Sequence, residues 1–281
     1  MNPKRFFYQQ GKKFLPGFIK SYLRTEFLNN NSLISASPFT LVEDNGKSYV
    51  EFILGKTLTA TKSANFDFYH IFKDDHVECS SFLELAQDAS CFFDVGSSRG
   101  VFSNMFCKLA KTNKAYAFEG SPTSCSAIKE LSDKNNLSDQ INIIEKMVGR
   151  HDYQDEFSFE DCGYVQVVSN SPHSRIVRDV ISLDSFLERN QITPDLIKID
   201  EEGYEYEVLQ GASKLLKDAS PTIILELHLA YLESRDINPE KVLKLLEETG
   251  YYFYDIQMNP TSSKRLLDTF QNVTHCITQK S

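Results

Sequence analysis

The chain has 281 residues, enough for one large domain or for one domain with a smaller appendage. A hydrophobic content of 41% and a charged content of 25% are typical of a water-soluble globular protein. The net charge of -9 disfavours a nucleic-acid partner, because phosphate binding needs a basic surface, and no apolar run reaches the roughly 20 residues of a membrane-spanning helix.

The six cysteines are scattered and include no Cys-x-x-Cys pair, which argues against a zinc site and against a disulfide framework. Lys12, Lys13 and Lys20 interrupt the apolar residues near the start, so no signal peptide is expected. Reduced thiols without a secretion signal predict a cytoplasmic protein. No pattern in the sequence predicts an oligomeric state.

Residues 1–85 differ in pattern from the rest, and we expect them to form an N-terminal extension of helix and strand that packs on the main domain. Residues 5–24 mix aromatic and basic side chains at helical spacing around Pro16, which favours a capping helix; a segment that lies on a membrane surface is the alternative. A strand is expected at 48–54, after a turn at 45–47.

Residues 86–281 alternate short apolar runs with amphipathic helical segments, which predicts a doubly wound, mostly parallel α/β sheet. The strands of this domain are expected at 91–95, 115–119, 141–148, 195–200 and 222–228. Its helices are expected at 101–112, 124–136, 204–216 and 238–250. A polar insert at about 150–194 carries two further short strands, at 164–168 and 175–183.

Ionisable residues end four of the expected strands: Asp94, Glu119, Asp200, and the pair Glu226 and His228. Ligands of such sheets bind at the carboxyl ends of the strands, near the switch in strand order. One acid at a strand end is an ordinary feature of a loop. A set at four strand ends predicts a shared site.

A glycine turn follows the first of these strands. Gly96 and Gly100 allow close approach of the backbone to a ligand, but Asp94-x-Gly96-x-Ser98-x-Gly100 is not the Gly-x-Gly-x-x-Gly fingerprint of a dinucleotide site. A nicotinamide-dependent oxidoreductase is therefore the weaker alternative. Glu119 can accept hydrogen bonds from the two hydroxyls of a ribose, and together these residues favour an adenosyl cofactor.

Five segments, in this order, resemble the FkbM family of class I S-adenosylmethionine-dependent methyltransferases. They are FFDVGSSRGVFS (92–103), AFEGSP (117–122), ISLDSFL (181–187), DLIKIDEEGYEYEVLQGA (195–212) and PTIILELH (221–228). The fourth segment is the most specific to the family. Two positions depart from the pattern: Ser98, where the broad class often has glycine, and Glu201, where the family usually has an apolar residue.

The resemblance implies methyl transfer from S-adenosylmethionine to a hydroxyl of a sugar, a glycolipid or a related natural product, so that the partner is a small-molecule or glycan acceptor. By analogy with the family, Glu119 would hold the ribose of the cofactor, and Val148 would lie near the adenine. The same analogy assigns the remaining cofactor contacts to Asp94, Gly96, Ser97, Ser98, Gly100 and Gly120.

An alcohol needs its proton removed or its oxygen polarised before it can accept a methyl group. Glu226 and His228 are two residues apart on a strand and share a face, so a carboxylate-oriented imidazole is the expected general base. Asp200 and Glu202 lie over the same crevice, where they orient the acceptor hydroxyl or, with His228, hold a divalent metal. The site is expected to work without the metal. A structural role for these residues stays the alternative.

Two other classes compete with this prediction. Methyltransferases that act on nucleic-acid amino groups resemble one another in an Asn/Asp-Pro-Pro-aromatic motif, and cytosine C5 enzymes in a Pro-Cys dipeptide. The sequence has neither, in agreement with its acidic charge. A non-catalytic binding module of the same fold stays open.

Overall fold

A computed structural model describes residues 39–44, 47–52, 56–61, 76–159, 175–268 and 273–280. The helix expected at 5–24 and the short strand expected at 164–168 lie outside these residues. The domain boundary near residue 85 stays a prediction. Among the described residues, no helix has the length and apolar character that crossing a membrane requires.

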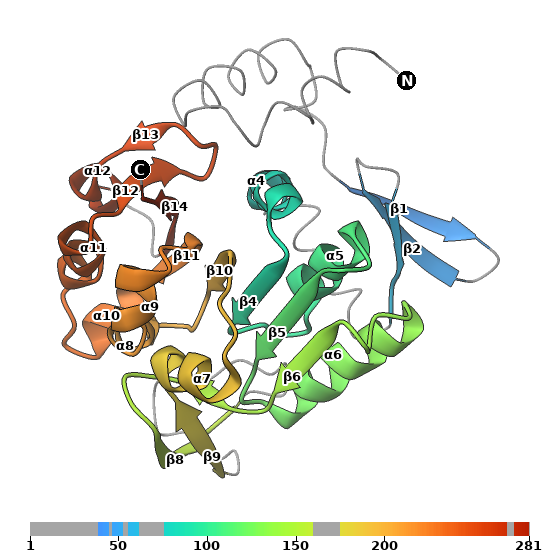
Figure 1. The fold of residues 1–281 in the computed structure, drawn as a ribbon, viewed down its shortest axis with the longest axis horizontal. Helices are drawn as coiled ribbons and strands as arrows, with labels where there is room; N and C mark the ends of the chain where they lie inside the picture. Colours follow the sequence, from blue (N-terminus) through green and yellow to red (C-terminus); the bar gives the residue numbers. More distant parts are fainter. Residues whose placement is uncertain are drawn as a thin grey trace. The chain divides into compact units, whose positions relative to one another are not determined.

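The central sheet has eight strands (Figure 1). They are β4 (Cys91–Val95), β5 (Lys114–Phe118), β6 (Ile141–Ile144), β10 (Leu196–Ile199), β11 (Thr222–His228), β12 (Tyr252–Asp255), β13 (Pro260–Thr261) and β14 (Val273–Gln279). Their order is β13-β12-β14-β11-β10-β4-β5-β6. The strands from β11 to β6 are parallel, and β14, β12 and β13 extend the sheet as antiparallel strands. The predicted class, a mostly parallel α/β sheet, is confirmed.

The strand order switches between β4 and β10. From β4 the chain continues to β5 and β6 on one side, and β10 later joins the other side of β4. Both strands are buried on both faces, which explains their nearly continuous apolar sequences. Phe92 and Phe93 alternate between the two faces of the sheet, and each enters a different hydrophobic cluster. A ligand site is therefore expected where the carboxyl ends of β4 and β10 diverge.

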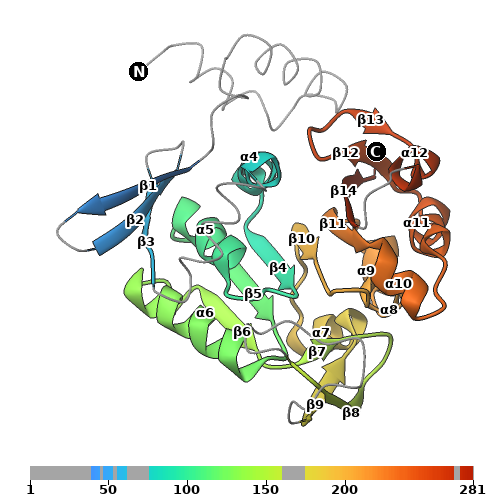
Figure 2. The same ribbon diagram turned by 180° about the vertical axis from the view of Figure 1, so that it is seen from behind.

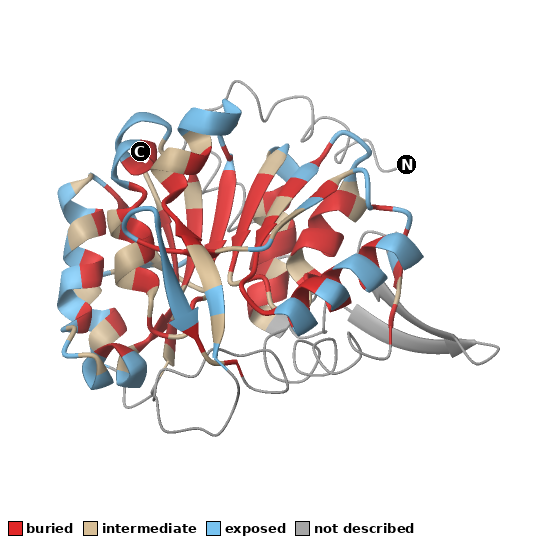
Figure 3. Ribbon diagram, turned by 90° about the horizontal axis from the view of Figure 1, so that it is seen from below, coloured by how far each residue is buried: buried red, intermediate tan, exposed pale blue. Residues whose placement is uncertain are grey.

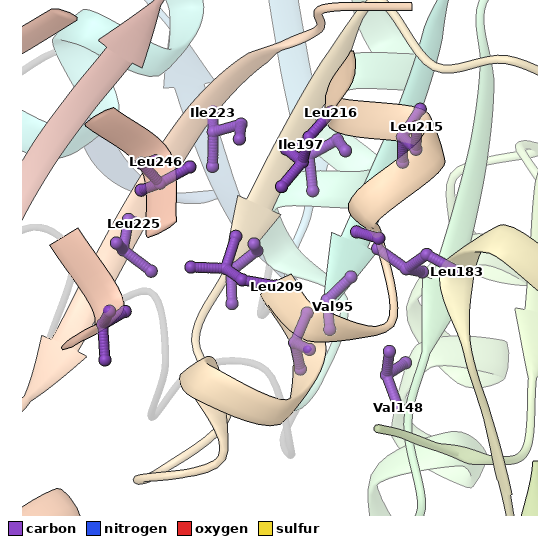
Figure 4. Packing of buried hydrophobic residues seen from close by; sticks show 14 of the residues in the cluster. Val95, Val148, Leu183, Ile197, Leu209, Leu215, Leu216, Ile223, Leu225 and Leu246 are labelled. Atoms are coloured by element: carbon purple, nitrogen blue, oxygen red, sulfur yellow. The ribbon is translucent and has the colours of Figure 1, made fainter. Parts of the chain in front are cut away.

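Helices cover both faces of the sheet, as the views from behind and from below show (Figures 2 and 3). The helices are α4 (His76–Leu85), the 3-10 turn η3 (Ala86–Asp88), α5 (Val101–Leu109), α6 (Pro122–Lys134), α7 (Leu183–Asn190), α8 (Glu205–Gln210), α9 (Ser213–Asp218), α10 (Leu229–Ser234), α11 (Pro239–Glu248) and α12 (Ser263–Leu267). On one face α4, α5 and α6 pack through buried residues such as Phe82, Met105 and Ile128. On the other face α7, α8, α9 and α11 pack over the strands (Figure 4).

The helix expected at 204–216 is two helices, α8 and α9, and the break falls at Gly211. A Cβ built on Gly211 would lie 2.0 Å from the carbonyl oxygen of Gly149, so the chain passes too close to another segment for a larger residue. The cap predicted for the last helix is present, because the side chain of Asn238 accepts a hydrogen bond from the N–H of Glu240. The close contact with Gly149 explains the glycine at the break, and the local apolar pattern does not contain it.

The strand expected at 141–148 is also divided. Ile141–Ile144 pairs with β5, whereas β7 (Met147–Val148) pairs with β9 (Ile176–Ile181) in a second sheet of order β7-β9-β8, in which β8 is Tyr153–Phe157. A tight turn separates the two parts, since the N–H of Lys146 donates to the carbonyl of Ile144. This small sheet is built mainly from the polar insert.

A third sheet, of order β1-β2-β3, precedes the main domain. Its strands are β1 (Phe39–Asp44), β2 (Lys47–Phe52) and β3 (Lys56–Thr59). The strand β2 matches most of the one expected at 48–54. Leu58 is fully buried in the hydrophobic cluster that also contains residues of α5. The backbone N–H and C=O of Thr59 form hydrogen bonds with the side-chain amide of Asn135, at the end of α6.

Candidate functional site

The four strands that end in ionisable residues are neighbours, in the order β11-β10-β4-β5. Because they are parallel, their carboxyl ends lie along one edge of the sheet. The structure therefore brings the predicted strand-end residues Asp94, Glu119, Asp200, Glu226 and His228 to the same edge. The site has two parts, a glycine loop after β4 and β5 and a cluster of acids after β10 and β11.

The glycine loop packs directly on the end of β10. Gly96 has φ +74°, and a Cβ built there would lie 1.9 Å from the carbonyl oxygen of Asp200. The N–H groups of Gly96 and Ser97 both donate to the carbonyl of Phe118, at 3.1 Å each. Ser98 also has positive φ, and Gly100 ends the loop immediately before α5. The loop is thus fixed against β5 on one side and against Asp200 on the other.

Asp94 is buried below this loop and anchors α5. The N–H and the hydroxyl of Ser103 donate to Asp94 Oδ2 at 3.1 and 2.6 Å. Burial raises the pKa of Asp94 to about 6, although the Ser103 hydrogen bonds oppose the rise. One carboxylate oxygen is therefore used to hold the helix start.

Glu119 lies at the end of β5 and is also buried. The N–H of Ser121 donates to Glu119 Oε1 at 2.7 Å, and burial raises the pKa of this carboxyl to about 8. Next to it, a Cβ built on Gly120 would lie 2.1 Å from the sulfur of Met147. Val148 packs in the hydrophobic cluster near Val95 (Figure 4). Glu119, the predicted ribose ligand, is thus next to β7, the strand that carries Val148, the predicted adenine contact.

The acid cluster surrounds His228. Its Nδ1 lies 2.7 Å from Glu205 Oε1, and Glu205 is fully buried. Its Nε2 faces three carboxylates, at 3.3 Å from Glu202 Oε2, 3.7 Å from Glu226 Oε1 and 3.9 Å from Asp200 Oδ1. The predicted catalytic residues therefore converge on one nitrogen, and the carboxylate that orients the imidazole is Glu205.

Lys198 supplies the main buried positive charge of the cluster. Its Nζ lies 2.7 Å from Asp200 Oδ2, 3.6 Å from Glu226 Oε2 and 3.7 Å from Glu78 Oε1. Burial lowers the pKa of Lys198, but the three carboxylates raise it by more, to well above 10.5. The lysine therefore stays charged although only 3% of its surface is exposed.

The remaining titrating groups are shifted by burial and by one another. Burial raises the pKa of Glu202 to about 7, against the opposing charge of His228. Burial alone would lower the pKa of His228 and of His275, but the hydrogen bonds that they donate to Glu205 and Glu226 raise both pKa values to about 9. Burial raises the pKa of Glu226, and the hydrogen bond from His275 and the charge of Lys198 more than reverse this, so it stays ionised.

Four residues of the cluster were not predicted: Glu78, Lys198, Glu205 and His275. Lys198 gave a signal, because a lysine inside an otherwise apolar central strand must be paired. Glu205 lies in the segment most specific to the family, residues 195–212, in which the sequence indicates other residues for the site. Glu78 and His275 come from α4 and β14, which are distant in sequence, and no local pattern connects them to the site.

Comparisons with known proteins identify relatives by sequence and similar chains among solved structures. The chain is 27% identical over 172 residues to the hexuronic acid methyltransferase AglP of Haloferax volcanii, and the match spans 59% of this chain and 65% of that protein. An FkbM methyltransferase crystal structure from Methylobacillus flagellatus KT is 15% identical, with 78% of this chain and 55% of that chain aligned at a TM-score of 0.43. An O-methyltransferase from Bacillus cereus in complex with SAH is 12% identical, with 77% and 85% aligned at a TM-score of 0.43.

The family model described as the methyltransferase FkbM domain matches residues 94–253, which include the glycine loop, Glu119 and the strand-end acids. This range is more than half of the chain. The resemblance of the five sequence segments is thereby confirmed, and the chain belongs to the FkbM family of methyltransferases.

Proposed function

We propose that the protein is an S-adenosylmethionine-dependent O-methyltransferase that acts on a hydroxyl of a sugar, a glycolipid or a related natural product. The observation that carries the proposal is the contact between Gly96 and the carbonyl of Asp200. It joins a cofactor-type loop to a cluster of acids, so that a methyl donor and an acceptor can meet at one edge. The name of the relative in Haloferax volcanii supports a hexuronic acid as the first acceptor to test.

The residues on the cofactor side fit an adenosyl group. The Gly96 turn leaves no room for a Cβ, so the backbone itself borders the site. Glu119 is held by the N–H of Ser121 at one oxygen, and its carboxyl group retains further hydrogen-bonding capacity for ribose hydroxyls in either protonation state. S-adenosylmethionine, when bound, supplies a methyl group activated by a sulfonium. The loop and Glu119 would hold the cofactor beside the acid cluster.

The residues on the acceptor side can orient a hydroxyl and take its proton. The side chains of Asp200 and Glu202 are 26% and 23% exposed, whereas His228 is 7% exposed. An acceptor oxygen that enters from solvent therefore reaches the two carboxylates first. His228, held by Glu205 from behind, faces both carboxylates, and its positive charge opposes the rise in their pKa that burial causes. Alignment of the hydroxyl and removal of its proton are the two contributions that methyl transfer to an alcohol needs.

Calorimetric titration with S-adenosylhomocysteine tests the cofactor, with NAD as the parallel ligand. We expect binding of S-adenosylhomocysteine alone, and weaker binding by Glu119→Gln, which keeps the size of the side chain but removes the carboxylate. The matched control is Glu240→Gln, at the exposed start of α11. Binding of NAD alone would identify a dinucleotide enzyme, and binding of neither ligand would favour a binding module.

Methyl transfer to hexuronic acid glycosides and to neutral sugars, followed by mass spectrometry, tests the acceptor. A mass increase of one methyl group, with His228→Ala inactive but still able to bind S-adenosylhomocysteine, is the expected result. Full activity of His228→Ala would remove this histidine from the reaction. Methylation of an amine in place of a hydroxyl would contradict O-transfer.

A further inference from the structure

One nitrogen of His228, Nε2, is surrounded by the carboxylates of Asp200, Glu202 and Glu226. Glu205 Oε1 lies 2.7 Å from Nδ1, so when a cation displaces the proton of Nε2, the remaining ring proton is held on Nδ1 and the lone pair of Nε2 points into the acid cluster. The carboxylate oxygens around Nε2 lie at 3.3–3.9 Å, beyond the length of about 2.7–2.9 Å of a charge-assisted hydrogen bond. His228 is only 6% exposed, so this nitrogen faces the carboxylates and not bulk water.

This spacing is that of ligands around a cation. Metal–ligand bonds of about 2.0–2.2 Å place neighbouring ligand atoms roughly 3 Å apart and opposite ones roughly 4 Å apart. One ligand atom each from Asp200, Glu226 and His228 lies within 4.8 Å of the others. Contrary to the expectation from the sequence, we propose that these three residues bind a divalent cation of the Mn²⁺ type, with Glu202 beside the open positions.

Each proposed ligand is held from behind by another residue. Glu205 fixes the Nδ1 side of His228. Lys198 bonds to Asp200 Oδ2 at 2.7 Å, and it shares Glu226 Oε2 with His275, at 3.6 and 3.3 Å. The other oxygens, Oδ1 and Oε1, are the ones that face Nε2. Such outer contacts orient metal ligands and are part of most metal sites.

A second group with similar spacing consists of Glu78, Glu226 and His275. Here Lys198 already lies between the acids, at 3.7 Å from Glu78 and 3.6 Å from Glu226. Its ammonium supplies the positive charge that a cation would bring. In the His228 group, Lys198 contacts Asp200 and Glu226 through Oδ2 and Oε2, and the oxygens that face Nε2 are Oδ1 and Oε1. The geometry therefore favours the His228 group.

The donor set also selects the kind of cation. One imidazole and two carboxylates match first-row divalent ions such as Mn²⁺ better than Ca²⁺, which prefers oxygen ligands alone. Three protein ligands leave positions open, as in catalytic sites and unlike closed structural sites. The inference deepens the proposed function and rests on it in one respect, that an acceptor hydroxyl would occupy an open position. Binding of the cation itself is independent of methyl transfer.

The test is binding of Mn²⁺ alone to the full chain after treatment with a chelator, followed by the loss of the electron paramagnetic resonance signal of free Mn²⁺. We expect one Mn²⁺ per chain, and binding at least about tenfold weaker for His228→Gln and for Asp200→Asn. Glu78→Gln belongs only to the second group and should bind Mn²⁺ as the unaltered protein does. Circular dichroism and thermal unfolding show whether each variant is folded.

Two results would overturn the inference. One is the absence of Mn²⁺ binding by the unaltered protein at millimolar concentrations. The other is unchanged binding by His228→Gln or Asp200→Asn, which together with a loss in Glu78→Gln would place the cation in the second group. Titration with S-adenosylhomocysteine on the same samples separates this outcome from failure of the proposed function, since a protein that binds that ligand but no Mn²⁺ contradicts the cation site alone.

Discussion

Replacement of Gly96 by alanine should destabilise the protein far more than the same change at Gly250. Both glycines have positive φ, +74° and +89°. At Gly250 the nearest atom to a new Cβ is Lys280 Cε at 4.0 Å, so Gly250→Ala changes the backbone preference and makes no clash. At Gly96 the new Cβ would lie 1.9 Å from the carbonyl oxygen of Asp200.

The expected magnitudes follow from these distances. An alanine in the left-handed region costs about 1 kcal/mol, which is the whole effect expected at Gly250. Ordinary van der Waals contact begins at 3.4 Å, so the Gly96 loop and the end of β10 must separate by about 1.5 Å. Overpacking of a rigid contact costs roughly another 1–3 kcal/mol. Gly96→Ala should therefore lose about 2–4 kcal/mol of unfolding free energy.

Urea unfolding followed by circular dichroism measures both variants against the unaltered protein. Gly96→Ala should in addition weaken binding of S-adenosylhomocysteine, whereas Gly250→Ala should not, because Gly250 lies at the end of α11, outside the candidate site. Equal losses of stability in the two variants would refute the reasoning. They would mean that the glycine loop does not contact the end of β10.

Four further predictions concern the same edge of the sheet and its supports. Burial raises the pKa of Glu119 from 4.5 to about 8, so between these pH values the native carboxyl keeps a proton that the unfolded chain has lost. The free energy of unfolding should therefore fall by up to ~1.4 kcal/mol per pH unit as the pH rises from about 5 to 8. Glu119→Gln should flatten this slope, as measured by denaturation at each pH. An unchanged slope would assign the effect to other groups. Lys198→Met leaves three carboxylates without their buried cation and should lower the free energy of unfolding in urea by roughly 3–5 kcal/mol. An unchanged free energy would show that these carboxylates become protonated at little cost. Asp184→Ala removes the carboxylate that accepts the first N–H groups of α9 and should cost about 1–2 kcal/mol, and a cost near zero would mean that solvent replaces the cap. Glu201→Leu removes a carboxyl that is only 5% exposed and whose pKa burial raises well above 4.5, so it should stabilise the protein by roughly 1–3 kcal/mol, and a loss of stability would contradict this expectation.

The sheet could be predicted from sequence where the strands are buried on both faces. The runs at β4, β5, β10 and β11 are mostly apolar, and their carboxyl ends carry the site. The antiparallel strands β12 and β14 were not predicted. Tyr252 is exposed while Phe253 is buried, and His275 lies between buried neighbours, so these strands alternate over too few residues to stand out.

From the sequence, the candidate site could be predicted only for the residues at the ends of strands. Convergence of Asp200, Glu226 and His228 on one edge needs nothing beyond parallel strands. The partners that hold these side chains depend on packing. Glu78 contacts Lys198 from α4, within the part of the chain that is expected to form the N-terminal extension packed on the main domain. Such contacts between distant elements leave no periodic signal in the sequence.

The segment most specific to the family, residues 195–212, contributes to both parts of the candidate site. Lys198 balances the buried acids, and the backbone carbonyl of Asp200 packs on Gly96 while its side chain faces His228. Glu205, at the start of α8, holds the same histidine. Each of these residues is constrained by a neighbour on another element, so a change at one position disturbs both the glycine loop and the acid cluster. The specificity of the sequence pattern is thus explained by the joining of the two halves of the site in one strand, turn and helix.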